Sequence, residues 1–270
     1  MKRVLLFLPV VLFLSIISID RAYSAEEKIT GLDVMKETRE IYQSDDQLSI
    51  VTLRLINKQG EERKIVTTRL WKSYKGKNGF DSKTVFFTEF PPDSKGVGFL
   101  IWDYSIEGKS DDLWLYLPSL RQVRRISTRD QDDAFMGSDL TFADMGQRRL
   151  DEDNHKLLRI EKYNGEPCYV IASTPKDKGS IYSKKITWVS KKNSIILKID
   201  YYDRKGELLK IQTINWQSRN GGYWVWNNTH VKNVQTDHKT FYEISKLRIN
   251  VGLRDNEFTE RALKIGNRRR

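Results

Sequence analysis

Residues 195–232, IILKIDYYDRKGELLKIQTINWQSRNGGYWVWNNTHVK, decide the fold class. Three runs rich in β-branched and aromatic residues are separated here by two short polar stretches, Asp203-Arg204-Lys205-Gly206 and Asn220-Gly221-Gly222. Gly and Asn accept the positive φ that tight hairpin turns require. The stretch therefore predicts three consecutive antiparallel strands, at Ile195–Tyr202, Leu208–Trp216 and Tyr223–Lys232.

The same pattern extends in both directions from this stretch. The other predicted strands are Leu48–Ile56, Lys64–Tyr74, Lys83–Phe90, Val97–Tyr104, Leu113–Leu117, Gln122–Ser127, His155–Tyr163, Cys168–Thr174, Lys184–Ser190 and Phe241–Ile249. Their connections are too short to hold the crossover helices that parallel strands need. A sheet with so many strands must curl or close. We therefore expect a mainly β protein with one long antiparallel sheet.

Two segments depart from the strand pattern. Leu32, Met35, Ile41 and Tyr42 recur at helical spacing, which predicts a helix between Gly31 and Asp45. The segment from Arg129 to Arg149 is acidic at first and then mixed. It predicts a loop followed by a short helix that Ser138-Asp139 would cap and that would run to about Arg149.

The first residues have the layout of a secretory signal peptide. Lys2 and Arg3 precede an apolar run from Val4 to Ile19, and the small-x-small triplet Ala22-Tyr23-Ser24 follows. We expect cleavage after Ser24, or alternatively after Ala25. The apolar run is shorter than the ~20 residues that span a bilayer, which disfavours a retained membrane anchor. The expected organisation is a signal peptide at 1–24 and one domain at 25–270, located in the periplasm.

The charge and the cysteine content narrow the function further. The net charge is +11, of which Lys2, Arg3, Arg21 and Asp20 together carry +2, so the exported part carries +9. A basic surface attracts anionic lipid headgroups, glycans or nucleic acid, and export makes nucleic acid the least favoured partner. The single cysteine, Cys168, lies in an apolar strand and is expected to be structural.

The chain carries no recognisable catalytic or cofactor motif. Its three histidines lack the spacing of a metal site, and no P-loop, G-x-S-x-G or G-x-G-x-x-G is present. The acidic stretch 130–139 places Ala134 and Phe135 where a calcium loop needs a ligand and a glycine. Carboxylate pairs such as Asp200 with Asp203, or Asp237 with Glu243, leave a glycan hydrolase as a weak alternative. We expect no enzyme activity, no cofactor and no bound metal.

Four stretches resemble the outer-membrane lipoprotein-sorting proteins, the LolA-like family. The central two are Leu113–Ile126 and Phe135-Met136-Gly137-Ser138-Asp139-Leu140-Thr141-Phe142-Ala143-Asp144-Met145, which is similar to the family pattern F-x-G-[ST]-D-[FL]-[TS]-[YF]-x-D-[LM]. The segments Phe90–Leu100 and Asp255–Leu263 resemble two further family patterns. No position carries a matching motif for the lid-closing arginine of the small carrier in this family; Arg69, before Trp71, is the candidate.

The resemblance implies a LolA/LolB-like fold, in which a long antiparallel sheet curls into an incomplete barrel that helices cover. It implies a periplasmic carrier that holds lipoprotein acyl chains or other lipids in an apolar cavity, works with an inner-membrane transporter and makes peripheral contact with membranes. The alternative is an exported, non-catalytic interaction module, such as an accessory subunit of an envelope transporter.

An apolar cavity on one face of the curled sheet is the expected ligand site. Alternating residues of two adjacent strands form two sets, and the sequence does not decide which set faces inward. The segment Phe135–Met145 is expected to be a mobile cover over the mouth, since it is too apolar for a solvated loop. The candidate cavity and lid residues are Phe99, Ile101, Trp102, Leu113, Trp114, Leu115, Tyr116, Leu117, Phe135, Met136 and Phe142.

Overall fold

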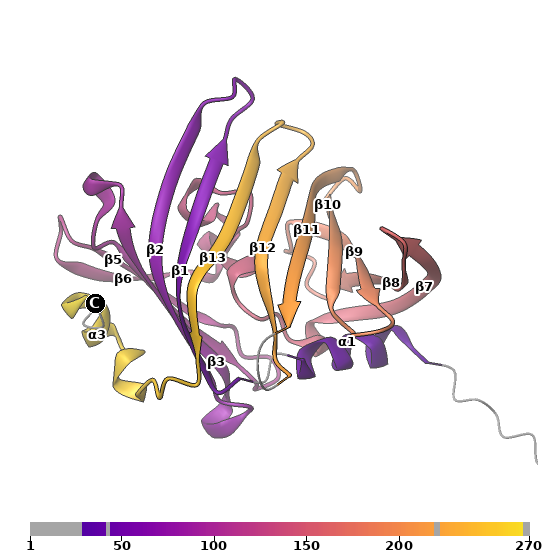
Figure 1. Ribbon diagram of the computed structural model, residues 1–270, viewed down its shortest axis with the longest axis horizontal. Coiled ribbons are helices and arrows are strands. Elements are labelled where there is room, and N and C mark those ends of the chain that lie inside the picture. The colour runs from indigo at the N-terminus through magenta and orange to yellow at the C-terminus, as the bar shows by residue number, and fades with distance from the viewer. Residues whose placement is uncertain (1–28, 42–43, 219–221, 267–270) are drawn as a thin grey trace, which may run out of the picture.

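The computed structural model describes residues 29–41, 44–218 and 222–266. The expected signal peptide at 1–24 therefore lies outside the described residues. Within these ranges, thirteen strands pair antiparallel in one curled sheet that is not closed into a barrel (Figure 1). The strands are β1 (Asp46–Ile56), β2 (Glu62–Ser73), β3 (Phe80–Phe90), β4 (Gly98–Tyr104), β5 (Asp112–Leu117), β6 (Gln122–Ile126), β7 (Asp153–Tyr163), β8 (Glu166–Pro175), β9 (Tyr182–Ser190), β10 (Ile196–Asp203), β11 (Leu208–Ser218), β12 (Trp224–Asn233) and β13 (Lys239–Ile249). The mainly β fold class is confirmed.

The strand order divides the sheet into two meanders that meet at its centre. The order is β6-β5-β4-β3-β2-β1-β13-β12-β11-β10-β9-β8-β7, so β1 and β13 pair in the middle and β6 and β7 form the two edges. The central pairing runs from Gln47 opposite Ile249 to Ile56 opposite Lys239, with one irregularity beside Leu48. The first and last strands of the chain thereby hold the two meanders together.

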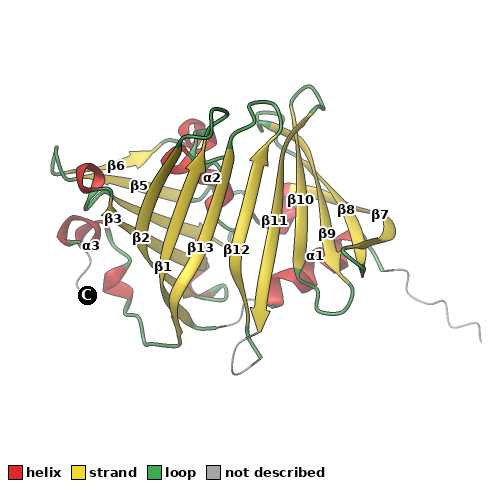
Figure 2. Ribbon diagram, turned by 45° about the horizontal axis from the view of Figure 1, so that its top comes forward, coloured by secondary structure: helices red, strands yellow, loops and turns green. Residues whose placement is uncertain are grey.

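Residues 127–152 connect the two edge strands and must cross the open side of the sheet. We call this stretch the crossing segment. In a flat sheet, β6 and β7 would lie about 58 Å apart, since neighbouring strands are spaced by about 4.8 Å. The crossing segment is instead folded into short turns, a bridge between Ala134 and Thr141, and the four-residue helix α2 (Phe142–Met145). Figure 2 shows α2 behind the curled sheet, on the side that the curl encloses.

The crossing segment packs on the concave face of the first meander. Phe135 and Leu140 join a buried cluster formed by side chains of β1–β5, β12 and β13. Its strand members are Val51, Leu53, Leu55, Ile65, Phe86, Phe99, Ile101, Leu113, Val231, Tyr242 and Ile244. The concave face is therefore filled at this end of the sheet by a piece of irregular chain.

Helix α1 (Gly31–Glu40) covers the other end of the concave face. Thr30 caps its first turn and forms a reciprocal capping box with Asp33. Val34 packs against Ile171 and Val189 of β8 and β9. A Cβ at Gly31 would lie 2.7 Å from the backbone nitrogen of Leu157, so only glycine permits this close approach to β7.

The C-terminal segment, residues 250–266, covers the convex face of the first meander. It contains a short 3-10 turn and helix α3 (Glu260–Ile265). Three apolar side chains of this segment are almost fully buried against β2–β5: Leu253, Phe258 and Leu263. The carboxylate of Asp46 accepts hydrogen bonds from the backbone nitrogens of Val251 at 2.7 Å and Leu253 at 2.9 Å. Among the described residues, no helix is both long and apolar enough to cross a membrane.

Two helix predictions differ from the structure in their bounds. The first helix ends at Glu40, and Asp45 already donates its backbone N–H to Asn250 beside the central strands. The second helix is only the four residues of α2 and begins after Thr141, whose side chain forms a capping box with Asp144. Ser138 cannot cap it, because its hydroxyl contacts Tyr242 instead.

Candidate functional site

A cavity of about 290 Å³ lies inside the curl of the sheet. We call it the inner cavity. Side chains from both meanders and from the crossing segment surround it, so it lies on the concave face. Its apolar wall consists of Trp71, Phe86, Leu140, Met145, Ile196, Ile214, Trp216 and Trp226. Its polar wall includes Arg69, Ser82, Thr84, Asp103, Asp144, Gln147, Gln212, Thr229 and Tyr242. Large apolar side chains together with convergent polar groups are typical of a small-molecule site.

One side of the inner cavity is formed by residues 135–145, which we call the plug. Phe135 is fully buried, with its ring centroid 5.4 Å from that of Phe86 and 5.0 Å from that of Phe99. Phe142 lies edge-on to Phe135 at 5.6 Å. Gly137 takes a φ of +79°, which a residue with a side chain rarely adopts. This backbone turn lets the plug place its aromatic side chains on the sheet.

Polar side chains of the plug are bonded to β13 and to the turn before it. The hydroxyl groups of Ser138 and Tyr242 are 2.5 Å apart and share a hydrogen bond. The carboxylate of Asp139 accepts from the Thr240 hydroxyl at 2.6 Å and lies 2.8 Å from Nδ1 of His238. These contacts fix the plug to the strand at the centre of the sheet.

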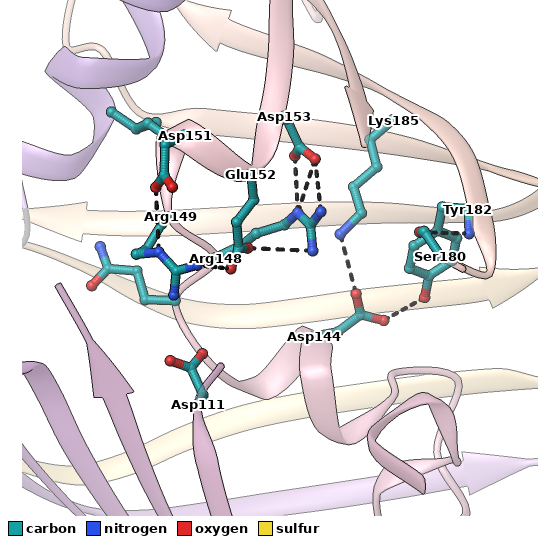
Figure 3. Close-up of polar contacts among 12 residues, drawn as sticks. Asp111, Asp144, Arg148, Arg149, Asp151, Glu152, Asp153, Ser180, Tyr182 and Lys185 are labelled. Atoms are coloured by element: carbon teal, nitrogen blue, oxygen red, sulfur yellow. Dashed lines mark hydrogen bonds and ion pairs between the residues drawn. The ribbon is translucent and has the colours of Figure 1, made fainter. Parts of the chain in front are cut away.

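A buried ion cluster holds the other end of the plug. The Asp144 carboxylate, only 3% exposed, lies 2.8 Å from Nζ of Lys210, which is 2% exposed. It also lies 3.3 Å from Nζ of Lys185 and accepts a 2.6 Å hydrogen bond from the hydroxyl of Tyr182 (Figure 3). Burial alone would raise the pKa of Asp144, but the two ammonium groups outweigh burial and hold that pKa well below its ordinary value. The carboxylate therefore stays ionised inside the protein.

A second, polar cleft of about 430 Å³ lies on the outer side of the plug. We call it the outer cleft. Arg148 contacts both carboxylate oxygens of Asp153 at 3.0 Å, and Arg149 contacts Glu152 at 2.6 Å (Figure 3). Arg149 also donates to the backbone oxygen of Lys109 between β4 and β5. The contact with Asp153 ties the end of the crossing segment to the edge strand β7, and the contact with Lys109 ties it to the loop between β4 and β5.

Residue 146 separates the inner cavity from the outer cleft and lies between two carboxylates. A Cβ at Gly146 would lie 2.7 Å from an oxygen of Asp103 and 3.6 Å from an oxygen of Asp111. Burial raises the pKa of Asp103 to about 6 and that of Asp111 to about 7. Asp103 accepts hydrogen bonds from the hydroxyl of Ser82 at 2.5 Å and from the backbone nitrogen of Gln147 at 2.9 Å. The boundary between the inner cavity and the outer cleft thus contains two carboxyl groups, those of Asp103 and Asp111, that change charge near neutral pH.

Comparisons with known proteins place this architecture in a family. A Vibrio parahaemolyticus domain assigned to outer-membrane lipoprotein sorting is 32% identical over 87% of this chain and 98% of that domain, with a TM-score of 0.81. The chain belongs to the LolA-like family. A DUF1329 family protein from Desulfovibrio piger is 30% identical over 86% of this chain and 97% of its own, with a TM-score of 0.81. A LolA superfamily protein from Nitrosomonas europaea shares the fold at 20% identity and a TM-score of 0.68, covering 87% and 99% of the two chains.

Two other comparisons add less to this assignment. A family model described only as that of an "uncharacterized protein" matches residues 80–265. No curated protein matches the chain. The LolA-like assignment therefore depends on the solved structures, whose chains are aligned with this one over nearly their whole lengths.

The LolA-like signature stretch Phe135–Met145 is the plug itself. Its conspicuous polar positions, Ser138, Asp139, Thr141 and Asp144, all make the contacts described above. Each contact joins the plug to itself or to the sheet. The spacing of the signature thus encodes how the concave face is covered.

The two alternating sets of predicted cavity residues lie on opposite faces of the sheet. Phe99, Ile101 and Leu113 belong to the concave cluster, and Leu115, Met136 and Phe142 pack against that cluster. Trp102, Trp114 and Tyr116 belong to the convex cluster beneath the C-terminal segment. Leu117, the last residue of β5, is partly buried. None of the eleven predicted residues lines the inner cavity; Ile101, Leu113 and Phe142 line the outer cleft. Their role in ligand binding stays a prediction.

Sequence analysis did not single out the three tryptophans of the inner cavity as wall residues. Trp71, Trp216 and Trp226 come from β2, β11 and β12, and Trp216 lies opposite Trp226 across a bulge. The sequence signal that could have indicated them is the pair Trp216 and Trp226, which stand on either side of the predicted hairpin turn between β11 and β12. Arg69, the candidate for the lid-closing arginine, does line the cavity; it donates to Oε1 of Gln47 at 2.9 Å and lies over the ring of Trp71.

Proposed function

We propose that this protein is an exported, non-enzymatic carrier that holds lipoprotein acyl chains or other lipids in the inner cavity. The observation that supports this most directly is the inner cavity itself, a hollow inside the curled sheet with three indole rings in its wall. Each buried CH₂ group of a ligand would contribute about 0.8 kcal/mol. An acyl chain could then be held without any catalytic group.

The size of the inner cavity implies that the plug moves when a long chain binds. Its volume of about 290 Å³ is at the lower end of the ~300–1,000 Å³ typical of small-molecule sites. Displacement of the plug would uncover Phe99, Ile101, Leu113 and Leu115 and add their surface to the cavity. In this proposal Phe135, Met136 and Phe142 are lid residues, whereas Trp102, Trp114 and Tyr116 support the sheet from the convex side.

The proposed cellular setting is based on the expectations from the sequence and on the relatives. A signal peptide at 1–24, cleaved near Ser24, would deliver a single domain at 25–270 to the periplasm. The assignment of the Vibrio parahaemolyticus relative to lipoprotein sorting supports lipid or lipoprotein cargo. An inner-membrane transporter would be the donor, in line with the resemblance described above.

A matched pair of variants on β11 tests the carrier proposal. Ile214 lines the inner cavity, whereas Ile211 lies on the other face of the same strand, and both are partly buried. Mature protein is gently purified, its bound lipid is identified by native mass spectrometry, and binding of a fluorescent fatty acid is titrated. Ile214→Gln should weaken binding about tenfold or more, because an amide would replace apolar wall, and Ile211→Gln should leave binding unchanged.

Two results would contradict the carrier proposal. One is wild-type protein that contains no lipid and does not bind the fatty acid, which would favour an exported interaction module. The other is equal weakening by both substitutions, which would place the fatty acid elsewhere on the protein.

A further inference from the structure

Three segments meet at one corner of the convex face, next to helix α3 (Figure 1). They are the loop 90–96 after β3, the turn 118–121 between β5 and β6, and the end of α3. Lys95, Pro118, Lys264 and Ile265 line the same hollow of about 240 Å³. A Cβ at Gly96 would lie 3.3 Å from Pro118, so the first two segments are in contact. We call this surface the basic corner.

The basic corner exposes large apolar side chains. Leu120 is 54% exposed, Ile265 is 45% exposed and Phe90 is 44% exposed. Ile265 lines the hollow, Leu120 follows two residues after Pro118, and Phe90 follows Glu89, which also lines the hollow. Single exposed apolar residues are common on proteins, but a group of them on one surface indicates an interaction site.

The charged side chains of the corner are mostly cationic. Lys95, Arg121, Arg261 and Lys264 are exposed. Across the described residues, no carboxylate forms an ion pair with any of these four. The exposed acids in the same segments are Asp93 and Glu260, and the partly buried Glu89, which accepts a hydrogen bond from Thr68, also lines the hollow.

We propose that the basic corner docks the protein on an anionic lipid surface. Leucine, isoleucine and phenylalanine enter the boundary between headgroups and acyl chains, while lysine and arginine side chains contact lipid phosphates. This combination matches a lipid interface, where each cation near the surface adds to the attraction. The proposal does not depend on cargo in the inner cavity, because the corner lies on the opposite face of the sheet.

The far edge of the sheet supplies matched controls. On β7, Leu158 is 42% exposed and Ile160 is 54% exposed. Lys156 and Lys162 on the same strand are exposed as well. Substitutions at these positions change the net charge and the exposed apolar surface as much as substitutions at the corner do. They therefore separate a local docking site from the effect of a generally basic protein.

The test measures binding of the mature protein to vesicles by co-sedimentation. Vesicles of phosphatidylglycerol and phosphatidylcholine in equal parts are compared with vesicles of phosphatidylcholine alone, at low and high salt. Wild-type protein should bind only the anionic vesicles, and salt should weaken binding. Arg121→Glu with Lys264→Glu should lower the partition coefficient roughly twentyfold or more, because each cation contributes about fivefold. Leu120→Asp with Ile265→Asp should also lower it.

The control pairs decide the outcome. Lys156→Glu with Lys162→Glu, and Leu158→Asp with Ile160→Asp, should change binding less than twofold. Equal losses in the corner and control pairs, or no binding of wild-type protein to anionic vesicles, would overturn the proposal. Fatty-acid binding is measured on the same variants. Fatty-acid binding that is retained in the corner variants would show that the carrier function is independent of vesicle docking. Fatty-acid binding that is absent from every variant, wild type included, would contradict the carrier proposal and leave the docking proposal standing.

Discussion

The plug and the C-terminal segment cover opposite faces of the same strands and are held by different forces. The plug is fixed on the concave face by buried polar contacts, including Asp144 with Lys210 and Ser138 with Tyr242. The C-terminal segment is fixed on the convex face mainly by Phe258 and Leu263, both fully buried. Both covers bury apolar side chains and make hydrogen bonds to the sheet, but of the two it is the plug that is held by a buried ion cluster, Asp144 with Lys210.

This difference suggests which cover can move. A hydrogen bond contributes only about 0.5–1.5 kcal/mol net, because water replaces the lost partner when the bond opens. Ions that leave a buried site likewise recover hydration, which offsets the attraction they lose. Apolar packing is recovered only if another apolar surface takes its place. We therefore expect the plug to open locally and the C-terminal segment to leave only when the sheet unfolds.

The largest expected effect comes from truncating one phenylalanine in each cover. Phe258 and Phe135 are both fully buried. Phe258→Ala should lower the free energy of unfolding by about 4 kcal/mol, as is usual for buried phenylalanine. Phe135→Ala should lower the free energy of unfolding by less, because a plug that can open locally contributes less to global stability. It should instead speed hydrogen exchange at residues 135–145. Chemical denaturation and hydrogen exchange measure both quantities. Equal losses of stability would show that the plug is core and not a lid.

A smaller effect is expected at the buried ion cluster. Lys210→Met removes one partner of Asp144 and should cost about 3 kcal/mol, because the remaining carboxylate is buried with fewer compensating charges. Most of this loss should appear as faster exchange in the plug. The control is Lys232→Met, since Lys232 pairs with Asp237 on the surface, where such pairs contribute about 0–1 kcal/mol. Unchanged exchange in Lys210→Met would mean that this cluster does not hold the plug.

The smallest expected effect is a pH dependence of stability that comes from Asp111, beside the plug. Because the folded pKa of Asp111 is about 7 and the ordinary value is 3.8, the folded protein retains a proton there that the unfolded chain loses above about pH 4. Stability should therefore fall as pH rises from about 4 to about 7. Asp111→Asn should flatten this slope and stabilise the protein at pH 8 by roughly 2 kcal/mol, with little change at pH 4.

A substitution in the C-terminal segment is the control for this pH dependence. The pKa of Asp255 is lowered, chiefly by hydrogen bonds from Lys72 and Tyr74. The ionised Asp255 carboxylate therefore contributes to stability above about pH 4, and this contribution is lost only in more acidic solution. Asp255→Asn should leave the slope between pH 4 and pH 7 as it is in wild type. Asp103, with a pKa of about 6, should leave part of the slope below pH 6 in place, so a slope between pH 6 and pH 7 as steep in Asp111→Asn as in wild type would contradict the role given to Asp111. Thermal unfolding across the pH range measures both variants.

Most of the strands could be predicted from the sequence because hairpin turns leave local marks. The stretch 195–232 carries its own turn residues, and it forms β10, β11 and most of β12 as expected. Cys168 is fully buried in β8, also as expected. The four-residue helix α2 was predicted too long, since the capping box of Thr141 and Asp144 competes with the equally plausible cap at Ser138.

The wall of the inner cavity could not be predicted, because it depends on features that are not local. An alternating strand has two faces, and only pairing with distant strands decides which one is concave. A bulge on β12, where Asn215 lies opposite Asn228 but Trp216 lies opposite Trp226, shifts the alternation on that strand and turns Trp226 to the same side as Thr229, toward the cavity. The pairing of β1 with β13 likewise leaves no mark in either strand.

That central pairing also has a consequence for how the protein is made. Gln47 and Ile249 face each other although about two hundred residues separate them, so β1 lacks one neighbour until nearly the whole chain has emerged. Contacts between such distant residues form slowly. Until they form, each meander presents an open strand edge on which other chains could pair. In the proposed export, β1 would reach the far side of the membrane long before its partner β13, and folding chaperones there would be most useful during that interval.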